Sequence, residues 1–425
     1  MDMFSFLKKY PRLLRAARGI ESAACALSAA AHSDSPHRPR GPLTQADFLR
    51  TRGKDVVNRS GQQVFLRGVN AGGWLVYEEW MCPATSPDYR SMCGMLEERF
   101  GAETRDELLN VYLDHYWKEE DFDRCAALGV TALRLPFLYT HLADDAGKLR
   151  PDAFARLDWF VGHCQKRGIY VILDLHGAFG SQNGEQHSGQ INDGRQLFYH
   201  PGNRAKTLRL WQAIARHYKG NPAVAGYDLL NEPMGPGKEA ARTGKVHWDY
   251  FNELYRAIRA VDPDHIIIME ACWVAIHLPH PLRYGWKNVV YQYHYYPWGL
   301  GDSPGAIIAF NGGALLFPKL IPRGVPVLMG EFCCFGSDEA WRQTLQFSNQ
   351  LRYHWTTWTY KVLGSAKNRD PYWGIYEHDT PKADIQNDSA ETIRAIWSQL
   401  GTENCVPTRL GGILKAYLSP NRNRP

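Results

Sequence analysis

Short apolar runs recur along this chain, and an amphipathic segment separates each run from the next. Three of them, at residues 170–175 (YVILDL), 265–270 (HIIIME) and 325–330 (VPVLMG), are largely apolar throughout and do not alternate between apolar and polar residues. A strand shows this pattern when both of its faces are buried, because helices cover both sides of its sheet. The chain is therefore constrained to an α/β architecture built on a parallel sheet.

Eight runs of this kind alternate with helical patterns. The predicted strands are residues 64–70, 131–137, 170–177, 224–233, 265–271, 288–296, 326–332 and 353–361, and the predicted helices are residues 103–128, 151–167, 202–219, 246–261, 338–351 and 389–400. This order predicts an eight-stranded β/α (TIM) barrel that forms a single domain. A doubly wound open sheet is the alternative, and it is disfavoured because no Gly-x-Gly-x-x-Gly turn follows the first strand.

Composition excludes several other classes of protein. The chain has 425 residues, of which 44% are hydrophobic and 22% are charged, so it is neither wholly disordered nor fibrous. The net charge of +5 is small and gives no case for a nucleic-acid partner. No window of 18 apolar residues occurs, so no transmembrane helix is expected.

The two ends of the chain differ from its middle. We expect residues 1–42 to form a basic N-terminal helix and a linker, residues 43–418 the barrel, and residues 419–425 a polar tail. Basic residues among leucine and phenylalanine near the N-terminus favour a peripheral contact with a membrane surface, and hence a cytoplasmic or membrane-peripheral location. The small-residue run at 23–31 leaves secretion as the alternative. The oligomeric state is left open.

The nine cysteines form no C-x-x-C pair and their number is odd, so neither a zinc site nor a disulfide scaffold is expected. One bridge, between Cys82 and Cys93, is left open. The histidines at 187, 200 and 217 do not have the spacing of a ligand triad, so we expect no metal.

Polar residues occur at the C-terminal ends of the predicted strands, where a β/α barrel carries its catalytic groups. They are Asn70, Arg134, Asp174, His176, Asn231, Glu232, Glu270, His294, Tyr296, Glu331 and Trp358. Glu232 ends the fourth strand and Glu331 the seventh, on opposite sides of a barrel, so their carboxyl groups can face each other across its mouth. Two facing carboxyl groups are the apparatus of glycoside hydrolysis.

Six short motifs occur in the order and spacing of glycoside hydrolase family 5. They are LRLPF (133–137), DLHG (174–177), LLNEP (229–233), YHYY (293–296), GEF (330–332) and WTYK (358–361). Over residues 60–400 the chain resembles this family, in the retaining clan whose glutamates end strands four and seven. The resemblance implies hydrolysis of a carbohydrate or glycoside substrate without a cofactor.

Carried over by position, Glu232 resembles the acid/base and Glu331 the nucleophile of that family. Arg134 is expected to hold Glu331 ionised by its opposite charge, and Tyr296 to donate a hydrogen bond to the same carboxylate. We expect His294 to tune Glu232, which would then have the raised pKa of a catalytic acid.

The same resemblance implies a sugar-binding set around this pair. Asn231 is expected to bind the sugar 2-hydroxyl, and His176 to bind the sugar in the same subsite. Trp358 is expected to form the stacking floor, with Trp355 as the alternative.

Residues 66–80 and 174–184 are similar to the exo-β-1,3-glucanase branch, in which the glutamate matching Glu78 grips a terminal glucose. The chain departs from that branch at Gln186, where the branch has an acidic residue, and at Phe332, where it has tryptophan. Glu185 is one position away and could take the place of the missing acid.

We therefore expect a retaining hydrolase of β-linked glucose, in a β-glucan or a β-glucoside. The alternatives are an endo-acting β-1,4-glucanase or β-mannanase, a steryl or ceramide β-glucosidase, and a non-catalytic carbohydrate-binding barrel. The last would lack one of the two glutamates.

Overall fold

The computed structural model describes residues 36–192, 196–233, 239–271, 277–300, 303–363, 373–378 and 380–418, with only the backbone described for 239–245. The predicted N-terminal helix and the polar tail lie outside these residues, so the division of the chain at 42 and 418 stays a prediction.

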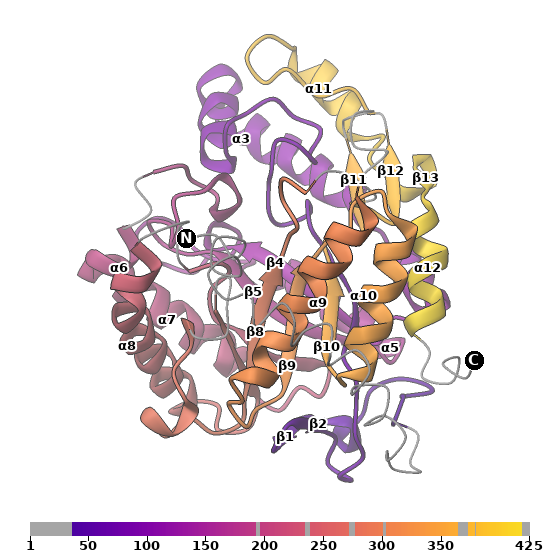
Figure 1. Ribbon diagram of the computed structural model, residues 1–425. Coiled ribbons are helices and arrows are strands. Elements are labelled where there is room, and N and C mark those ends of the chain that lie inside the picture. The colour runs from indigo at the N-terminus through magenta and orange to yellow at the C-terminus, as the bar shows by residue number, and fades with distance from the viewer. Residues whose placement is uncertain are drawn as a thin grey trace.

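Eight parallel strands close into a barrel, which confirms the predicted fold (Figure 1). They are β3 (Arg67–Asn70), β4 (Ala132–Leu138), β5 (Tyr170–Gly177), β6 (Val224–Asp228), β7 (Ile266–Glu270), β8 (Val289–Tyr295), β9 (Val327–Phe332) and β10 (His354–Thr357). The ring closes where β10 pairs with β3, with Trp355 opposite Arg67. Residues of all eight strands are buried almost throughout, as their apolar composition requires.

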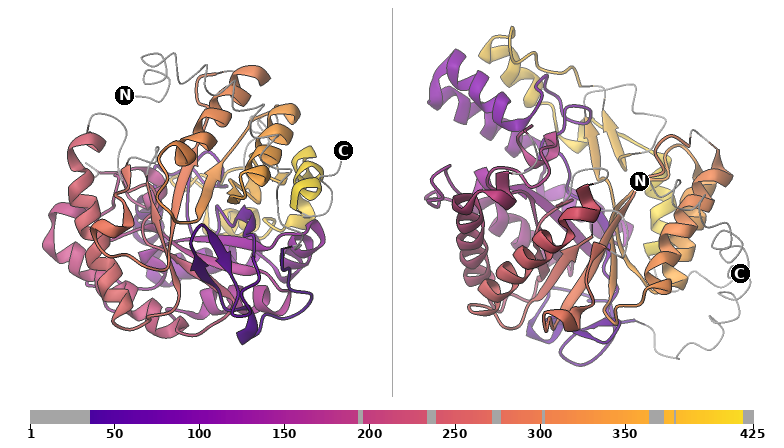
Figure 2. Two further views of the ribbon diagram at one scale, coloured as in Figure 1. Left: turned by 60° about the horizontal axis from the view of Figure 1, so that its bottom comes forward. Right: turned by 60° about the vertical axis from the view of Figure 1, so that its left-hand side comes forward.

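Helices cover the outside of this barrel (Figure 2). The α-helices are α3 (Tyr89–Tyr116), α4 (Glu119–Leu128), α5 (Ala155–Lys166), α6 (Gln196–Tyr199), α7 (Pro201–Tyr218), α8 (Glu239–Arg259), α9 (Pro304–Leu320), α10 (Asp338–Gln350), α11 (Ala390–Trp397) and α12 (Arg409–Leu418). Single 3₁₀ turns occur at Gln45–Asp47, Tyr139–His141, Gln186–Ser188, Pro281–Arg283 and Thr402–Asn404.

Two small sheets lie outside the barrel. The hairpin of β1 (Arg50–Arg52) and β2 (Asp55–Val57) lies at the lower end in Figure 1, and α3 and α11 lie side by side at the upper end. The strands β11 (Lys361–Leu363), β12 (Tyr376–His378) and β13 (Val406–Pro407) form the second small sheet.

The structure corrects several predicted boundaries. The predicted helix at 103–128 is two helices, because Lys118 is the N-cap of a new helix and its N–H donates to the Asp121 carboxylate at 2.9 Å. The predicted strand at 224–233 ends at Asp228, and the one at 353–361 ends at Thr357. Cys82 and Cys93 are both free thiols, so the bridge between them is wrong.

No helix among the described residues is long and apolar enough to cross a membrane, as the sequence predicts for this part of the chain.

Gly330 lets β9 approach β8 closely, one residue before Glu331. A Cβ at this position would lie 2.4 Å from Cδ of Gln292, whose buried side chain comes from β8. We predict that Gly330→Ala lowers the free energy of unfolding by about 1–3 kcal/mol, the usual cost of overpacking. Urea denaturation measures this.

Gly312→Ala is the matched control. Gly312 lies inside α9, and a Cβ added there would have no atom within 4 Å, so alanine should be neutral or stabilise by up to about 1 kcal/mol. Equal stability of the two variants would contradict the packing described for Gly330.

Candidate active site

Arg134 lies at the centre of a buried network at the carboxyl ends of the strands. Its Nε donates to Asp228 at 2.8 Å, and its Nη2 lies 3.0 Å from an Asp174 oxygen. Nη1 donates to Oε1 of Glu331 at 2.7 Å. Nη2 also donates to Oδ1 of Asn231 at 2.9 Å. A guanidinium with no exposure to water needs such partners, because an unpaired buried charge is expensive.

Glu331 sits next to the last residue of β9 and faces two donors. Besides Arg134, the Tyr296 hydroxyl donates to its Oε2 at 2.8 Å. Nδ1 of His294 lies 3.6 Å from the same oxygen. The side chain is only 6% exposed, so the one open direction for this carboxylate is into the pocket.

Glu232 follows β6 in a loop and has a φ of 39°, in the left-handed region. Its Oε1 lies 2.9 Å from Nδ1 of His294, and its backbone N–H donates to Oε1 of Glu270 at 3.0 Å. Both catalytic candidates approach Nδ1 of His294, so the distance between their two facing oxygens is at most the sum of the two distances given above. This upper limit is compatible with the spacing of about 5–5.5 Å in retaining enzymes. It reaches only the lower end of the range of about 6.5–9.5 Å in inverting enzymes.

The environments of these groups differ in their effect on protonation. Burial raises the pKa of Glu232, which favours its protonated form. Burial lowers the pKa of His294 and of His176 to about 3, so both imidazoles are neutral at neutral pH. The amide nitrogen of Gln292 lies 3.3 Å from Nε2 of His294. Nε2 therefore accepts, and Nδ1 carries the proton that faces Glu232.

His176 and Trp358 form one wall. Nδ1 of His176 pairs with Asp174 at 2.7 Å, and its ring stacks on Trp358 with centroids 5.5 Å apart and planes 17° apart. Trp355 is fully buried and donates to Oδ1 of Asn349, so it is not the stacking floor. Trp358 lines the pocket and Trp355 does not.

The pocket brings together seven of the nine predicted site residues. Its lining is Glu78, Trp80, His176, His187, Asn231, Glu232, Tyr296, Trp298, Glu331, Trp358 and Trp373. Arg134 and His294 lie beneath it and contact its carboxyl groups. The cavity has a volume of about 170 Å³, and Trp80, Trp298 and Trp373 are part of its lining.

No ligand role was predicted from the sequence for Trp80, Trp298, Trp373 or His187. Trp298 is 63% exposed. Its ring centroid lies 5.4 Å from that of Trp373, and the ring centroids of Trp373 and Trp80 are 4.9 Å apart. These tryptophans come from separate loops, so no local spacing relates them.

The loop after β5 holds Glu232 in place. Nε2 of Gln182 donates to the Asn231 carbonyl at 2.8 Å, and Nδ2 of Asn183 donates to the Glu232 carbonyl at 3.1 Å. Nε2 of His187 lies 3.6 Å from Oε2 of Glu232. Gln182 and Asn183 belong to the stretch 174–184, which the sequence analysis used to compare branches of the family, whereas His187 lies outside it.

Glu78 and Glu79 point in different directions. Nε1 of Trp80 donates to Oε2 of Glu78 at 2.8 Å, and burial raises the pKa of Glu78 to about 8. Glu79 is exposed, and its carboxylate lies 3.8 Å from Nζ of Lys382. The side-chain oxygen of Gln186 accepts a hydrogen bond from the backbone N–H of Glu79. Neither Gln186 nor Glu185 is part of the pocket lining described, so the pocket gives no support to Glu185 as a replacement for the missing acid.

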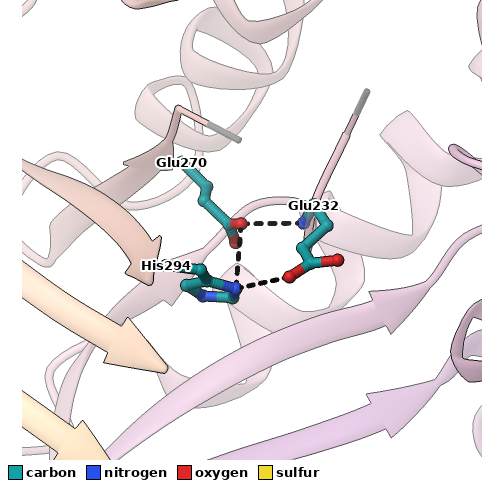
Figure 3. Close-up of side chains that lie close together, drawn as sticks. All are labelled: Glu232, Glu270 and His294. Carbon is teal, nitrogen blue, oxygen red and sulfur yellow. Dashed lines mark hydrogen bonds and ion pairs between the residues drawn. The ribbon is translucent and has the colours of Figure 1, made fainter. Parts of the chain in front are cut away.

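Three side chains of a kind that can bind a metal ion lie close together: Glu232, Glu270 and His294 (Figure 3). Each offers one ligand atom, and these atoms lie within 4.8 Å of one another. These atoms already bind one another or the Glu232 backbone. We therefore assign them no metal.

Comparisons with known proteins identify the family. The model for cellulase (glycosyl hydrolase family 5) matches residues 98–364. A β-xylosidase of Phanerodontia chrysosporium is 28% identical over 346 residues, which are 75% of this chain and 71% of that protein. A glucan 1,3-β-glucosidase of Blumeria graminis is 33% identical over 192 residues, which are 43% of this chain and 44% of that protein.

The fold comparison agrees. A β-glucanase from Saccharophagus degradans superposes with a TM-score of 0.53 at 17% identity, over 92% of this chain and 97% of its own. An endogalactoceramidase superposes with a TM-score of 0.61 at 18% identity, over 83% of this chain and 84% of its own.

A β/α barrel with two glutamates facing one pocket at the strand ends defines a glycoside hydrolase with a carbohydrate substrate. The chain belongs to glycosyl hydrolase family 5, whose members share the retaining mechanism.

Removing Arg134 should leave its buried carboxylates uncompensated. We predict that Arg134→Met lowers the free energy of unfolding at pH 7–8 by about 3–5 kcal/mol, the usual cost of breaking a buried pair. The loss should shrink at pH 5, because burial already raises the pKa of Asp174 and of Asp228 to about 7, and both become neutral in acid. Urea denaturation at the two pH values measures this.

Arg156→Met is its control. Arg156 pairs with Asp114 at 2.7 Å on the surface, where such pairs contribute about 0–1 kcal/mol. An Arg134→Met variant no less stable than this control would contradict the network.

Proposed function

We propose that this hydrolase removes β-linked glucose from the non-reducing end of a β-glucan or from a small β-glucoside, with Glu331 as nucleophile and Glu232 as acid/base. One observation carries the assignment. The two carboxyl groups face the same pocket on either side of His294, and only Glu331 is bound by the guanidinium of Arg134.

In the first step, an oxygen of Glu331 bonds to the anomeric carbon while the glycosidic bond breaks. Glu232 transfers its proton to the departing oxygen, so the aglycone leaves as a neutral alcohol and a glycosyl-enzyme ester forms. In the second step, water attacks the same carbon and gives a proton to Glu232, and Glu331 leaves as a carboxylate. Two displacements at one carbon return the β configuration.

The surrounding groups support these roles. Arg134 and Tyr296 stabilise the departing carboxylate of Glu331 in the second step. Neutral His294 presents a hydrogen-bond donor to Oε1 of Glu232 and leaves Oε2 on the pocket side to carry the transferred proton.

Exo action is favoured by Glu78. It comes from the loop after β3, lines the pocket and is held by Trp80, so a terminal sugar there would place its 4- and 6-hydroxyls within reach of the Glu78 carboxyl oxygens. The names of the curated relatives, β-xylosidase and glucan 1,3-β-glucosidase, also point to exo-acting enzymes.

A β-xylosidase is the second candidate, favoured by the relative that aligns over 75% of this chain. Xylose lacks the C6 hydroxymethyl group, so it offers one hydroxyl less to Glu78. Initial rates on matched aryl β-glucosides, β-xylosides and β-mannosides decide the sugar. Timed product analysis on β-1,3- and β-1,4-glucans and on glycolipids decides the linkage, the substrate class and whether the action is exo or endo. Mixed oligosaccharides among the early products would contradict exo action and indicate an endoglucanase.

The location of the enzyme rests on residues outside the described part. Peripheral attachment through the basic N-terminal segment and secretion both remain predictions.

The two glutamates should respond differently to substitution. Glu331→Gln should lower kcat by at least about 10²–10⁴-fold on every substrate, because no ester can form. Glu232→Ala should harm a poor leaving group more than an activated aryl group, and added azide should yield a β-glycosyl azide. Stopped assays with product NMR measure both. Equal losses on the two leaving groups, with no azide product, would contradict the acid/base assignment.

Glu78→Ala should raise KM for aryl β-glucosides about tenfold, because it removes two hydrogen bonds between the sugar and a carboxyl group, each of about 0.5–1.5 kcal/mol. Glu79→Ala is the matched control and should leave KM unchanged, since its carboxylate faces Lys382. Similar KM values for both variants would remove the closed subsite from the proposal.

A further inference from the structure

Glu270 is a buried carboxyl group of this site that has no part in the reaction as described. It ends β7, is 1% exposed, and lies below the pocket beside Glu232 and His294. Figure 3 shows its carboxyl group pointing at both.

Two separate paths connect Glu270 to Glu232. Directly, Oε1 of Glu270 accepts the Glu232 backbone N–H at 3.0 Å. Indirectly, Oε2 accepts from the amide nitrogen of Gln292 at 2.9 Å, and that nitrogen lies 3.3 Å from Nε2 of His294. His294 then presents Nδ1 to Oε1 of Glu232 at 2.9 Å.

The direct contact is made where the backbone is strained. A φ of 39° is uncommon for a glutamate and persists only where surrounding contacts hold it. Glu270 supplies an acceptor for the N–H of that residue, while Asn183 supplies a donor for its carbonyl. Both peptide groups of Glu232 are thus fixed from outside its own segment.

We propose that Glu270 is a positioning residue, which holds the backbone of Glu232 in its left-handed conformation and so aims the acid/base at the glycosidic oxygen. The inference rests on the proposed role of Glu232. Glu270 contacts no substrate atom and acts through Glu232 and His294.

The role requires an acceptor oxygen at the right distance and does not require a charge. Burial, and then the neighbouring Asp228, raise the pKa of Glu270 well above the usual range. A carbonyl oxygen of a neutral acid accepts an N–H as a carboxylate does, so a carboxamide of equal length should serve. Only Oε1 of Glu270, the acceptor of the Glu232 N–H, is required, so a changed contact between Oε2 and Gln292 is tolerated.

Two conservative variants separate distance from charge. Glu270→Gln keeps the length and the acceptor but loses the charge. Glu270→Asp keeps the charge but withdraws the carboxyl group by one methylene. Each is assayed on a phenyl and a 2,4-dinitrophenyl β-glycoside of the sugar that the wild type prefers, since only the phenyl group needs protonation to leave.

We expect Glu270→Gln to stay within about fivefold of wild-type kcat/KM on both substrates. Glu270→Asp should lose about 10²-fold on the phenyl glycoside, the typical effect of an ångström-scale misplacement, and less than about fivefold on the dinitrophenyl glycoside. Asp121→Asn is the control for loss of a buried carboxylate. Asp121 accepts from Lys118 and Tyr360 away from the pocket, so its variant should lose stability but keep the ratio of the two rates.

A second measurement needs no substrate. In a crystal structure of Glu270→Asp, the φ of Glu232 should leave the left-handed region and its carboxyl group should move away from His294. An unchanged Glu232 in that structure, equal losses on the two glycosides, or a Glu270→Gln variant as damaged as Glu270→Asp would each overturn the proposal. A wild-type enzyme inactive on every glycoside would instead overturn the proposed function, and the structure of the variant would still decide the role of Glu270.

Discussion

The rest of the site depends on one buried guanidinium. Arg134 contacts Asp174, Asp228 and Glu331 within 3.0 Å, and Glu270 lies 3.8 Å away. Burial keeps His176 and His294 neutral, so neither supplies a second positive charge. With more carboxyl groups than cations in a space closed to water, some of them must hold protons. Glu331 is bound directly to the cation, whereas Glu232, whose pKa is raised by burial, is not. The two catalytic candidates therefore differ in their electrostatic surroundings.

Backbone geometry adds to this electrostatic difference. Glu331 lies within strand β9 and pairs with His294 of β8, just after a shift in the register of the two strands, so the barrel itself holds its backbone. Glu232 lies beyond the end of β6, in a conformation that the strand does not impose. Its position has to come from contacts across the barrel and from the loop after β5, which hold its N–H and its carbonyl. The position of Glu232, the acid/base candidate, thus depends more on contacts from other segments than the position of Glu331 does.

Sequence predicted the parts of this structure that local patterns determine. Seven barrel strands are found within four residues of the predicted ends, because long apolar runs can only be buried strands in this order. The strand at 224–233 was extended too far, because no periodicity reports the positive φ of Glu232. Helix α9 was missed because Gly312, Gly313 and Pro318 lie inside it and are read as breakers. Glu232 and Glu331 could be paired from topology alone, whereas Trp80, His187 and Trp373 could not, because separate loops bring them together.

The pocket lining contains two kinds of residue with different origins. Strand-end groups belong to the charge network, whereas Trp80, Trp298 and Trp373 come from loops. Trp298 presents an exposed indole face, which a sugar ring or an apolar aglycone can cover without any charge being moved. Changes among these tryptophans can therefore alter which glycoside binds while the charge network keeps its protonation states, because none of the three contacts Arg134 in the network described.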